Sequence, residues 1–259
     1  IPFKYHKDIR SEAACFKSSS LAVKLAKRHG TKLHVLHLTT AKEMSLFDSS
    51  IPLEKKQITA EACVHHLFFN DQDYESKGSL IKCNPSIKTI NDRDTLRDAV
   101  NSNLIDIIAT DHAPHTLEAK ALGFPKAPSG MPGVETSLPV MLTHAKFGRC
   151  SIEDVARWMS KNVALCYNME GKGELTIGYD GDVVLVDMER EFVVKDEMSW
   201  SRVGWNPFRG IGLVGWPVKT IVGGIPVFER TEETGQKGRV LVSPGQVGEP
   251  LQMGSWSKV

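Results

Sequence analysis

A short apolar run that ends in a cluster of acidic and imidazole side chains is the feature that most limits how this chain can fold. The run Leu104–Ile108, interrupted by Asp106, is followed at once by the polar segment Ala109–His115. Aliphatic and β-branched residues in such a run predict a strand buried on both faces, as in a parallel sheet. Parallel sheets carry catalytic groups on the loops at the carboxyl ends of their strands. We therefore predict an α/β fold with Asp111 at that edge, where a carboxylate can bind a metal and accept a proton.

The first half of the chain alternates helix and strand signals. Ser18–Ser20 can cap a helix that runs to about Arg28 and ends at Gly30, Thr39 or Thr40 caps a short helix, and Asn91 caps a helix over Arg93–Val100. The predicted strands are Lys32–Leu38, Gln57–Ala62 and Leu104–Ala109. Alternating units of this kind are typical of a parallel sheet or barrel. Only three barrel strands are evident, whereas a closed barrel needs eight.

The second half changes from helices to short strands. The loop Ala119–Pro132 leads into helices predicted at Val134–Phe147 and at Ser151–Asn162, where Ser151 is a good N-cap. Glycine turns and short apolar runs begin at Gly173, and a hairpin is expected around Gly223–Gly224.

Composition excludes several classes of function. The 259 residues carry a formal net charge of +1, so nothing favours binding to nucleic acid or to an anionic membrane. No apolar run approaches the ~20 residues of a membrane span, and no signal peptide is visible. The five cysteines are scattered without a Cys-x-x-Cys pair, which indicates reduced thiols in a cytoplasmic protein.

Several segments, taken together, resemble a known enzyme family. The segments are Asp8–Cys15, Leu33–Thr40, Glu61–Leu67, Lys82–Ser86 and Ala109–Lys120. They are similar to the dihydroorotases, cyclic-amide hydrolases of the amidohydrolase superfamily, and the main motifs occur in the family's order. The resemblance implies a partial (β/α)8 TIM barrel of the metal-dependent hydrolase type over residues 1–172. It also implies a small C-terminal β-sandwich segment over residues 173–259.

The resemblance also assigns the candidate site. It implies His37 and Asp111 as metal ligands, Asp111 as the catalytic acid and base, Asn84 and His115 as substrate contacts, and two Zn²⁺ ions in a complete site. Taken alone, a histidine in a strand is more often a hydrogen-bonded core residue than a ligand, and Asn-Pro is often only a turn. We expect His34, His65 and His66 to be structural. Lys120 is expected to be a solvated loop lysine.

Part of the family's metal centre has no counterpart in this sequence. The family also uses an early His-x-His pair, a bridging acidic residue or carbamylated lysine, and a further histidine, and this chain contains no His-x-His. It begins at Ile1 without an initiator methionine. We expect it to be the C-terminal portion of a longer polypeptide, and to hold no complete two-metal site by itself.

The implied activity is the reversible, zinc-dependent cyclisation of carbamoyl-aspartate to dihydroorotate in pyrimidine synthesis. Two alternatives stay open. One is another cyclic amidohydrolase, acting on hydantoin, dihydropyrimidine or allantoin. The other is a catalytically inert relative that serves as a structural partner. The expected partners are a small-molecule substrate and, possible in this family, a second copy of the chain or aspartate transcarbamoylase.

Overall fold

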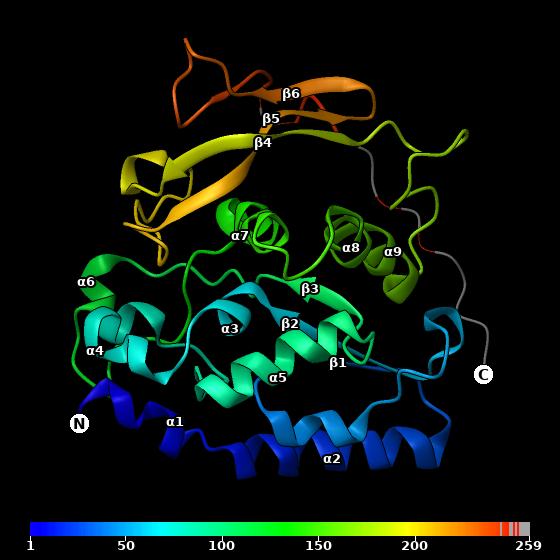
Figure 1. The fold of residues 1–259 in the computed structure, drawn as a ribbon, viewed down its shortest axis with the longest axis vertical. Coiled ribbons are helices and arrows are strands. Elements are labelled where there is room, and N and C mark those ends of the chain that lie inside the picture. Colours follow the sequence, from blue (N-terminus) through cyan, green and yellow to red (C-terminus); the bar gives the residue numbers. More distant parts are fainter. Residues whose placement is uncertain (244, 249–250, 252, 254–259) are drawn as a thin grey trace. The chain divides into compact units, whose positions relative to one another are not determined.

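The computed structural model describes residues 1–243, 245–248, 251 and 253, and Figure 1 labels its elements. The chain forms two compact units. Unit 1 is Ile1–Val134, and unit 2 comprises the described residues from Glu135 onward.

Unit 1 contains a three-stranded parallel sheet in the order β1-β2-β3. The strands are β1 (Leu33–Val35), β2 (Ile58–Cys63) and β3 (Ile107–Ala109). The central strand β2 is buried along nearly its whole length, as expected for a parallel strand covered on both faces. All three predicted strands and their parallel pairing are confirmed. Their carboxyl ends consequently meet at one edge of the sheet.

Helix α2 (Glu12–His29) begins earlier than predicted. Its N-cap is Ser11, whose hydroxyl accepts the Ala14 N–H at 3.3 Å, so the capping role predicted for Ser18–Ser20 is wrong. The N–H groups in the first turn of a helix have no partner within the helix. Ser11 precedes the alanine-rich start of α2 and accepts one of them. The helix ends at Gly30, with a φ of 64°, as predicted.

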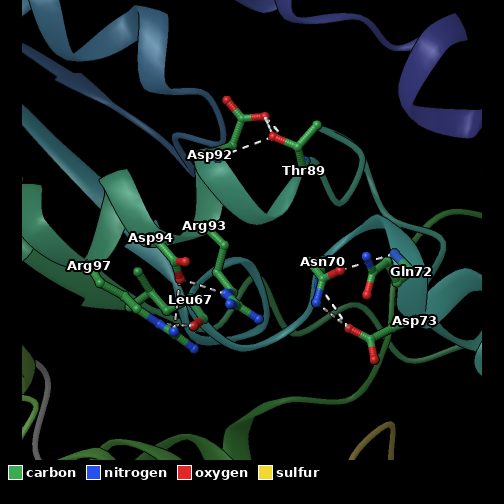
Figure 2. A network of polar contacts seen from close by, with 9 residues as sticks. All are labelled: Leu67, Asn70, Gln72, Asp73, Thr89, Asp92, Arg93, Asp94 and Arg97. Carbon is green, nitrogen blue, oxygen red and sulfur yellow. Dashed lines mark hydrogen bonds and ion pairs between the residues drawn. The ribbon is translucent and has the colours of Figure 1, made fainter.

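Helix α5 (Ile90–Asn101) is capped by Thr89 rather than by the predicted Asn91, which lies inside its first turn. Thr89 and Asp92 form a reciprocal capping box, drawn in Figure 2. The other Asp92 oxygen accepts the Ala41 N–H at 2.9 Å and so holds η2 (Ala41–Leu46), whose N-cap is Thr40 as predicted. These bonds fix the segment after β1 against α5.

A buried ion pair lies at the amino ends of β2 and β3, away from the carboxyl edge of the sheet. Lys56 Nζ is 2.7 Å from Asp106 Oδ1, and the other Asp106 oxygen accepts the Ala60 N–H at 2.9 Å. The remaining elements of unit 1 are short: η1 (Phe3–Tyr5), α1 (His6–Ile9), η3 (Leu53–Lys55), α3 (Val64–Phe68), η4 (Asp71–Asp73), α4 (Tyr74–Lys77), η5 (Gly78–Ile81) and α6 (Leu117–Lys120).

Unit 2 combines helices with an antiparallel sheet of order β4-β5-β6-β7. The strands are β4 (Val183–Val193), β5 (Gly212–Val222), β6 (Ile225–Glu229) and β7 (Arg239–Val240). The predicted hairpin at Gly223–Gly224 is confirmed as the β5–β6 connection. The helical elements are α7 (Val134–Lys146), α8 (Ile152–Ala156), the π-helical turn η6 (Arg157–Lys161), α9 (Asn162–Tyr167) and η7 (Asp196–Met198).

The helix positions predicted from the sequence of unit 2 agree closely with the structure. Helix α7 ends one residue before the predicted Phe147, and Ser151 caps α8 in a capping box with Asp154. Helix α7 packs on β5, because the Thr143 hydroxyl accepts the Val214 N–H at 2.9 Å. All five cysteines are free thiols. Among the described residues, no helix combines the length and the apolar character that crossing a bilayer requires.

Candidate metal and active site

His37 and Asp111 lie at the same edge of the parallel sheet. Each is two residues beyond a strand, His37 after β1 and Asp111 after β3. Both have positive φ angles, 37° and 44° respectively. Residues other than glycine seldom adopt this conformation, and those that do cluster at functional sites. The sharp turn at His37 also explains why β1 ends before the predicted Leu38.

Glu61 of β2 fixes the backbone around His37. One carboxylate oxygen accepts the His37 N–H at 3.2 Å, and the Glu61 carbonyl accepts the Leu38 N–H at 2.9 Å. The other carboxylate oxygen is 3.1 Å from His34 Nε2, and His34 Nδ1 is 2.8 Å from the Thr59 hydroxyl. Both ring nitrogens of His34 are thus engaged, which agrees with a structural role.

The His37 side chain fits a metal ligand. Its Nδ1 atom is buried and has no hydrogen-bond partner, whereas buried polar atoms in proteins are nearly always paired. A neutral imidazole nitrogen is the commonest metal ligand in proteins. Asp111 follows β3, which is separated from β1 by β2. Its carboxylate is exposed and supplies an oxygen donor at the same edge of the sheet. The two residues together offer the nitrogen and oxygen donors that zinc accepts.

The segment after Asp111 is held by the loop that follows α6. His112 Nδ1 accepts the Gly133 N–H at 3.0 Å, and the Ala113 N–H donates to the Met131 carbonyl at 3.1 Å. His115 Nε2 donates to the Ser129 carbonyl at 3.1 Å. The segment 129–133 is therefore hydrogen-bonded beside the segment 112–115. His115 is half-buried there.

Lys120 is not a solvated lysine, and that prediction is wrong. Its side chain is 1% exposed, and Nζ donates to three carbonyls, those of Lys82 at 3.1 Å, Pro128 at 3.0 Å and Gly130 at 2.8 Å. Burial lowers the pKa of Lys120 to about 8. Lysine is rarely buried unless its donors are paired, and these carbonyls come from segments that the sequence alone does not bring together.

Gly130 connects the two predicted substrate contacts. Its N–H donates to the Lys82 carbonyl at 2.8 Å, two residues before Asn84, and its neighbour Ser129 accepts the His115 ring. Gly130 has a φ of +129°, and a Cβ atom there would lie 2.6 Å from the Ala113 carbonyl oxygen. Asn84 is exposed and precedes a cis peptide bond to Pro85. One glycine contact thus anchors the Asn84 segment to the His115 segment.

The end of β2 carries a group of potential metal ligands that was not among the predicted site residues. Cys63, His65 and His66 are buried, with one potential ligand atom from each within 4.8 Å of the others. Burial lowers the pKa of His65 to about 3, and His37 contributes in the same direction. Burial, Glu61 and Asp111 raise the pKa of the Cys63 thiol. Both histidines were predicted to be structural, and the pattern Cys63-x-His65-His66 after a predicted strand is the sequence signal that points to a ligand group instead.

Comparison with known proteins gives the family. The amidohydrolase family model matches residues 12–227. The dihydroorotase of Bacillus caldolyticus is 35% identical over 209 residues, covering 80% of this chain and 48% of that protein. The dihydroorotase of Methanosarcina mazei is 31% identical over 254 residues, covering 95% of this chain and 56% of that protein. The chain therefore spans about half the length of the curated relatives it matches.

Solved structures give the same superfamily. The L-hydantoinase (dihydropyrimidinase) of Arthrobacter aurescens matches with a TM-score of 0.79 and 30% identity, over 88% of this chain and 50% of that one. A D-hydantoinase (dihydropyrimidinase) from a Thermus species matches with a TM-score of 0.82 over 94% of this chain and 53% of that one, and its 21% identity bears on the fold alone. The superfamily has a fold of the TIM-barrel type, and its enzymes are metal-dependent. With the family model matched over residues 12–227 and the predicted ligands at one sheet edge, this chain belongs to the amidohydrolase family.

Proposed function

We propose that this chain supplies the C-terminal part of a dihydroorotase, which reversibly cyclises N-carbamoyl-L-aspartate to L-dihydroorotate with zinc. The observation that carries the proposal is the 35% identity to a dihydroorotase over 209 residues. The region that matches the amidohydrolase family model, residues 12–227, includes His37, Asn84, Asp111 and His115. The position of His37 and Asp111 at one edge of the parallel sheet supports the same proposal. The compartment we propose is the cytoplasm.

For the architecture we propose a partial (β/α)8 barrel over residues 1–172 and a β-sandwich segment over residues 173–259, the last part of which lies outside the described residues. The parallel strands β1–β3 support the first, and the antiparallel strands β4–β7 support the second. The two compact units divide earlier, after Val134. The boundary at residue 172 follows instead the change from helices to strands along the chain.

In this proposal His37 and Asp111 hold zinc, and a complete site takes two ions. The His-x-His pair that the family also uses has no counterpart among these 259 residues. When bound, zinc polarises the ring carbonyl and makes water a competent nucleophile at neutral pH. The unpaired Nδ1 of His37 and the exposed carboxylate of Asp111 support these assignments.

The protein's own residues divide the remaining work. During ring opening, an Asp111 carboxylate oxygen accepts the proton of the attacking water as the carbonyl carbon becomes tetrahedral. Asp111 then delivers that proton to the ring nitrogen as the carbon–nitrogen bond breaks, and ring closure follows the reverse path. Asn84 donates to the substrate's carboxylate or ring amide, and His115, oriented by Ser129, binds the anionic group.

The test is the reaction of the zinc-loaded polypeptide that carries residues 1–259. We expect dihydroorotate to be opened and carbamoyl-aspartate to be cyclised, with little turnover of hydantoin, dihydrouracil or allantoin. Preference for hydantoin or dihydrouracil would replace the proposal by its first alternative. That alternative has one specific observation in its favour, the 30% identity to the Arthrobacter L-hydantoinase.

A second alternative is an inert relative that acts as a structural partner. Failure to turn over any of these cyclic amides with two zinc ions bound would exclude the enzyme and favour this alternative. Association with aspartate transcarbamoylase or with a second copy of this chain can be measured in the same preparation by sedimentation. The retained segments around His37, Asn84 and Asp111 favour the enzyme.

A further inference from the structure

Lys120 places a buried ammonium group at the end of α6. Its side chain is 1% exposed, and within the part of the chain that the structure describes no carboxylate forms an ion pair with it. The buried Lys56, by contrast, pairs with Asp106 at 2.7 Å. Burial of a charge without a counter-charge is costly, and an apolar side chain of similar length would fill the same space at lower cost. Packing alone therefore does not account for an ammonium group at this position.

One hydrogen bond of Lys120 holds the segment that carries Asn84. Nζ donates to the Lys82 carbonyl at 3.1 Å, two residues before Asn84, and the same carbonyl accepts the Gly130 N–H at 2.8 Å. The Lys82 side chain reaches the same loop, because its Nζ donates to the Pro125 carbonyl at 3.0 Å. The backbone on the amino side of the exposed Asn84 is thus held by the loop and by Lys120.

The other two hydrogen bonds of Lys120 hold the loop that orients His115. Nζ donates to the Pro128 carbonyl at 3.0 Å and to the Gly130 carbonyl at 2.8 Å. Between these two residues lies Ser129, whose carbonyl accepts the His115 Nε2–H at 3.1 Å. Three successive carbonyls therefore bond to one ammonium group and one imidazole. The direction of the His115 ring depends on the place of the Ser129 carbonyl, and Lys120 fixes the residues on both sides of it.

We propose that Lys120 is a positioning residue for the substrate's anionic group, because it holds the backbone segments of Asn84 and His115 in one fixed arrangement. The inference rests on the proposed function, in which these two side chains contact the substrate. Lys120 is too buried to contact substrate itself and acts through the two segments. Groups that are held in place before binding lose less conformational freedom when the substrate arrives. Loss of Lys120 should therefore weaken substrate binding and leave the chemical step unchanged.

Lys120→Met tests this role in the zinc-loaded polypeptide that carries residues 1–259. Methionine keeps an apolar stem of similar length and removes all three N–H donors. The KM for dihydroorotate should rise by roughly tenfold to hundredfold, since a displacement of about 1 Å at a positioned group can cost about 10²-fold. The values of kcat and zinc content should change little. If Lys120→Met does not fold, Lys120→Gln, which retains an N–H donor, replaces it, and a smaller rise in KM is expected.

A mutant cycle separates positioning from a general loss of structure. In a chain that already carries Asn84→Ala and His115→Ala, Lys120→Met should raise KM no further, because the two side chains through which it acts are absent. An independent structural effect would instead add to the effect of those two substitutions. Additive effects on KM would therefore overturn the positioning role.

Lys56→Met combined with Asp106→Asn is the matched control, because it also removes a buried ammonium group, at the amino ends of β2 and β3. This double variant should lower the free energy of unfolding in urea and leave KM unchanged. A KM that stays normal in Lys120→Met, or that rises equally in the control, overturns the inference and leaves the proposed function standing. Absence of dihydroorotate turnover in the unaltered zinc-loaded polypeptide overturns the proposed function, and the inference falls with it.

Discussion

The sheets of the two units differ in how deeply their strands are buried. In unit 1, β2 is buried almost throughout, and three buried ring nitrogens just after β1 and β2 have no hydrogen-bond partner, those of His37, His65 and His66. In unit 2, every position of β4 is half-buried or exposed. Its charged groups pair at the surface, as Lys146 does with Glu189 at 2.7 Å.

The difference indicates where chemistry is concentrated. Unpaired buried groups are costly to the fold, so the unpaired nitrogens of His37 and His65, just after β1 and β2, point to a ligand that binds at that edge. Exposed ion pairs such as Lys146 with Glu189 contribute little to stability and can be lost without consequence. Unit 1 therefore carries the candidate site, and unit 2 is a source of matched controls.

The largest expected effect is that of Asp111→Asn. The amide keeps the size and one oxygen but cannot accept a proton, so turnover of dihydroorotate should fall by ~10²–10⁴ while substrate still binds. Asp182→Asn is the control, since Asp182 accepts the Gly223 N–H at 2.7 Å in a turn of unit 2. The measurement is kcat in the zinc-loaded polypeptide, with metal content determined alongside. Near-normal turnover in Asp111→Asn would remove this residue from the mechanism.

The sequence predicted the strands and the edge of the sheet better than the contacts of the loops. Apolar periodicity is local, so β1, β2 and β3 and the position of Asp111 after β3 could be found from it. Helix starts were less certain, because several serines or asparagines near an N-terminus compete to cap it. Thr89 rather than Asn91 caps α5, because Asp92 lies three residues after Thr89 and completes a capping box.

The loop contacts could not be predicted for a different reason. Lys120 is satisfied by the carbonyls of Lys82, Pro128 and Gly130, and only the folded chain brings these together. The residues Cys63, His65 and His66 are neighbours in the sequence, but their burial and the closeness of their ligand atoms depend on the fold. Hydrogen bonds between residues that lie far apart in the sequence are the part of this site that sequence patterns do not predict.

Gly130→Ala should be the most destabilising of the loop variants. The new Cβ would meet the Ala113 carbonyl oxygen at 2.6 Å and the Ala113 Cβ at 2.7 Å. Gly178→Ala in unit 2 is the control, because Gly178 has a φ of +94° but nothing within 4 Å. Backbone strain alone costs of order 1–3 kcal/mol. Urea unfolding should show a larger loss for Gly130→Ala, and equal losses would mean that the loop yields freely.

The pH dependence of stability should reveal the buried Lys120. Burial lowers its pKa to about 8 in the folded chain, against about 10.4 when unfolded. Between these values the unfolded chain binds more protons, so this residue makes the free energy of unfolding rise with pH, and the rise is complete above the unfolded value.

Lys120→Met isolates that contribution. It leaves three carbonyls unpaired, at about 1–3 kcal/mol for a lost buried partner, and it removes the titration. The destabilisation relative to the unaltered chain should therefore be greater at pH 10 than at pH 7, as measured by urea unfolding at both. Lys146→Met, which breaks an exposed pair in unit 2, should cost little at pH 7. A Lys120 effect that shrinks as pH rises would contradict the assigned direction of its pKa.

The smallest expected effects are those of Asn84→Ala and His115→Ala, which test substrate binding apart from metal binding. Each removes one polar contact to an anionic substrate, and hydrogen bonds to charged groups contribute about 1.5–3 kcal/mol. The KM for dihydroorotate should rise roughly tenfold to hundredfold, with zinc content unchanged. His29→Ala, at an exposed position in the last turn of α2, is the control for loss of an imidazole. Loss of zinc in the His115 variant would make that residue a ligand. The candidate metal site after β1 and β3 would then include the loop segment that Gly130 anchors.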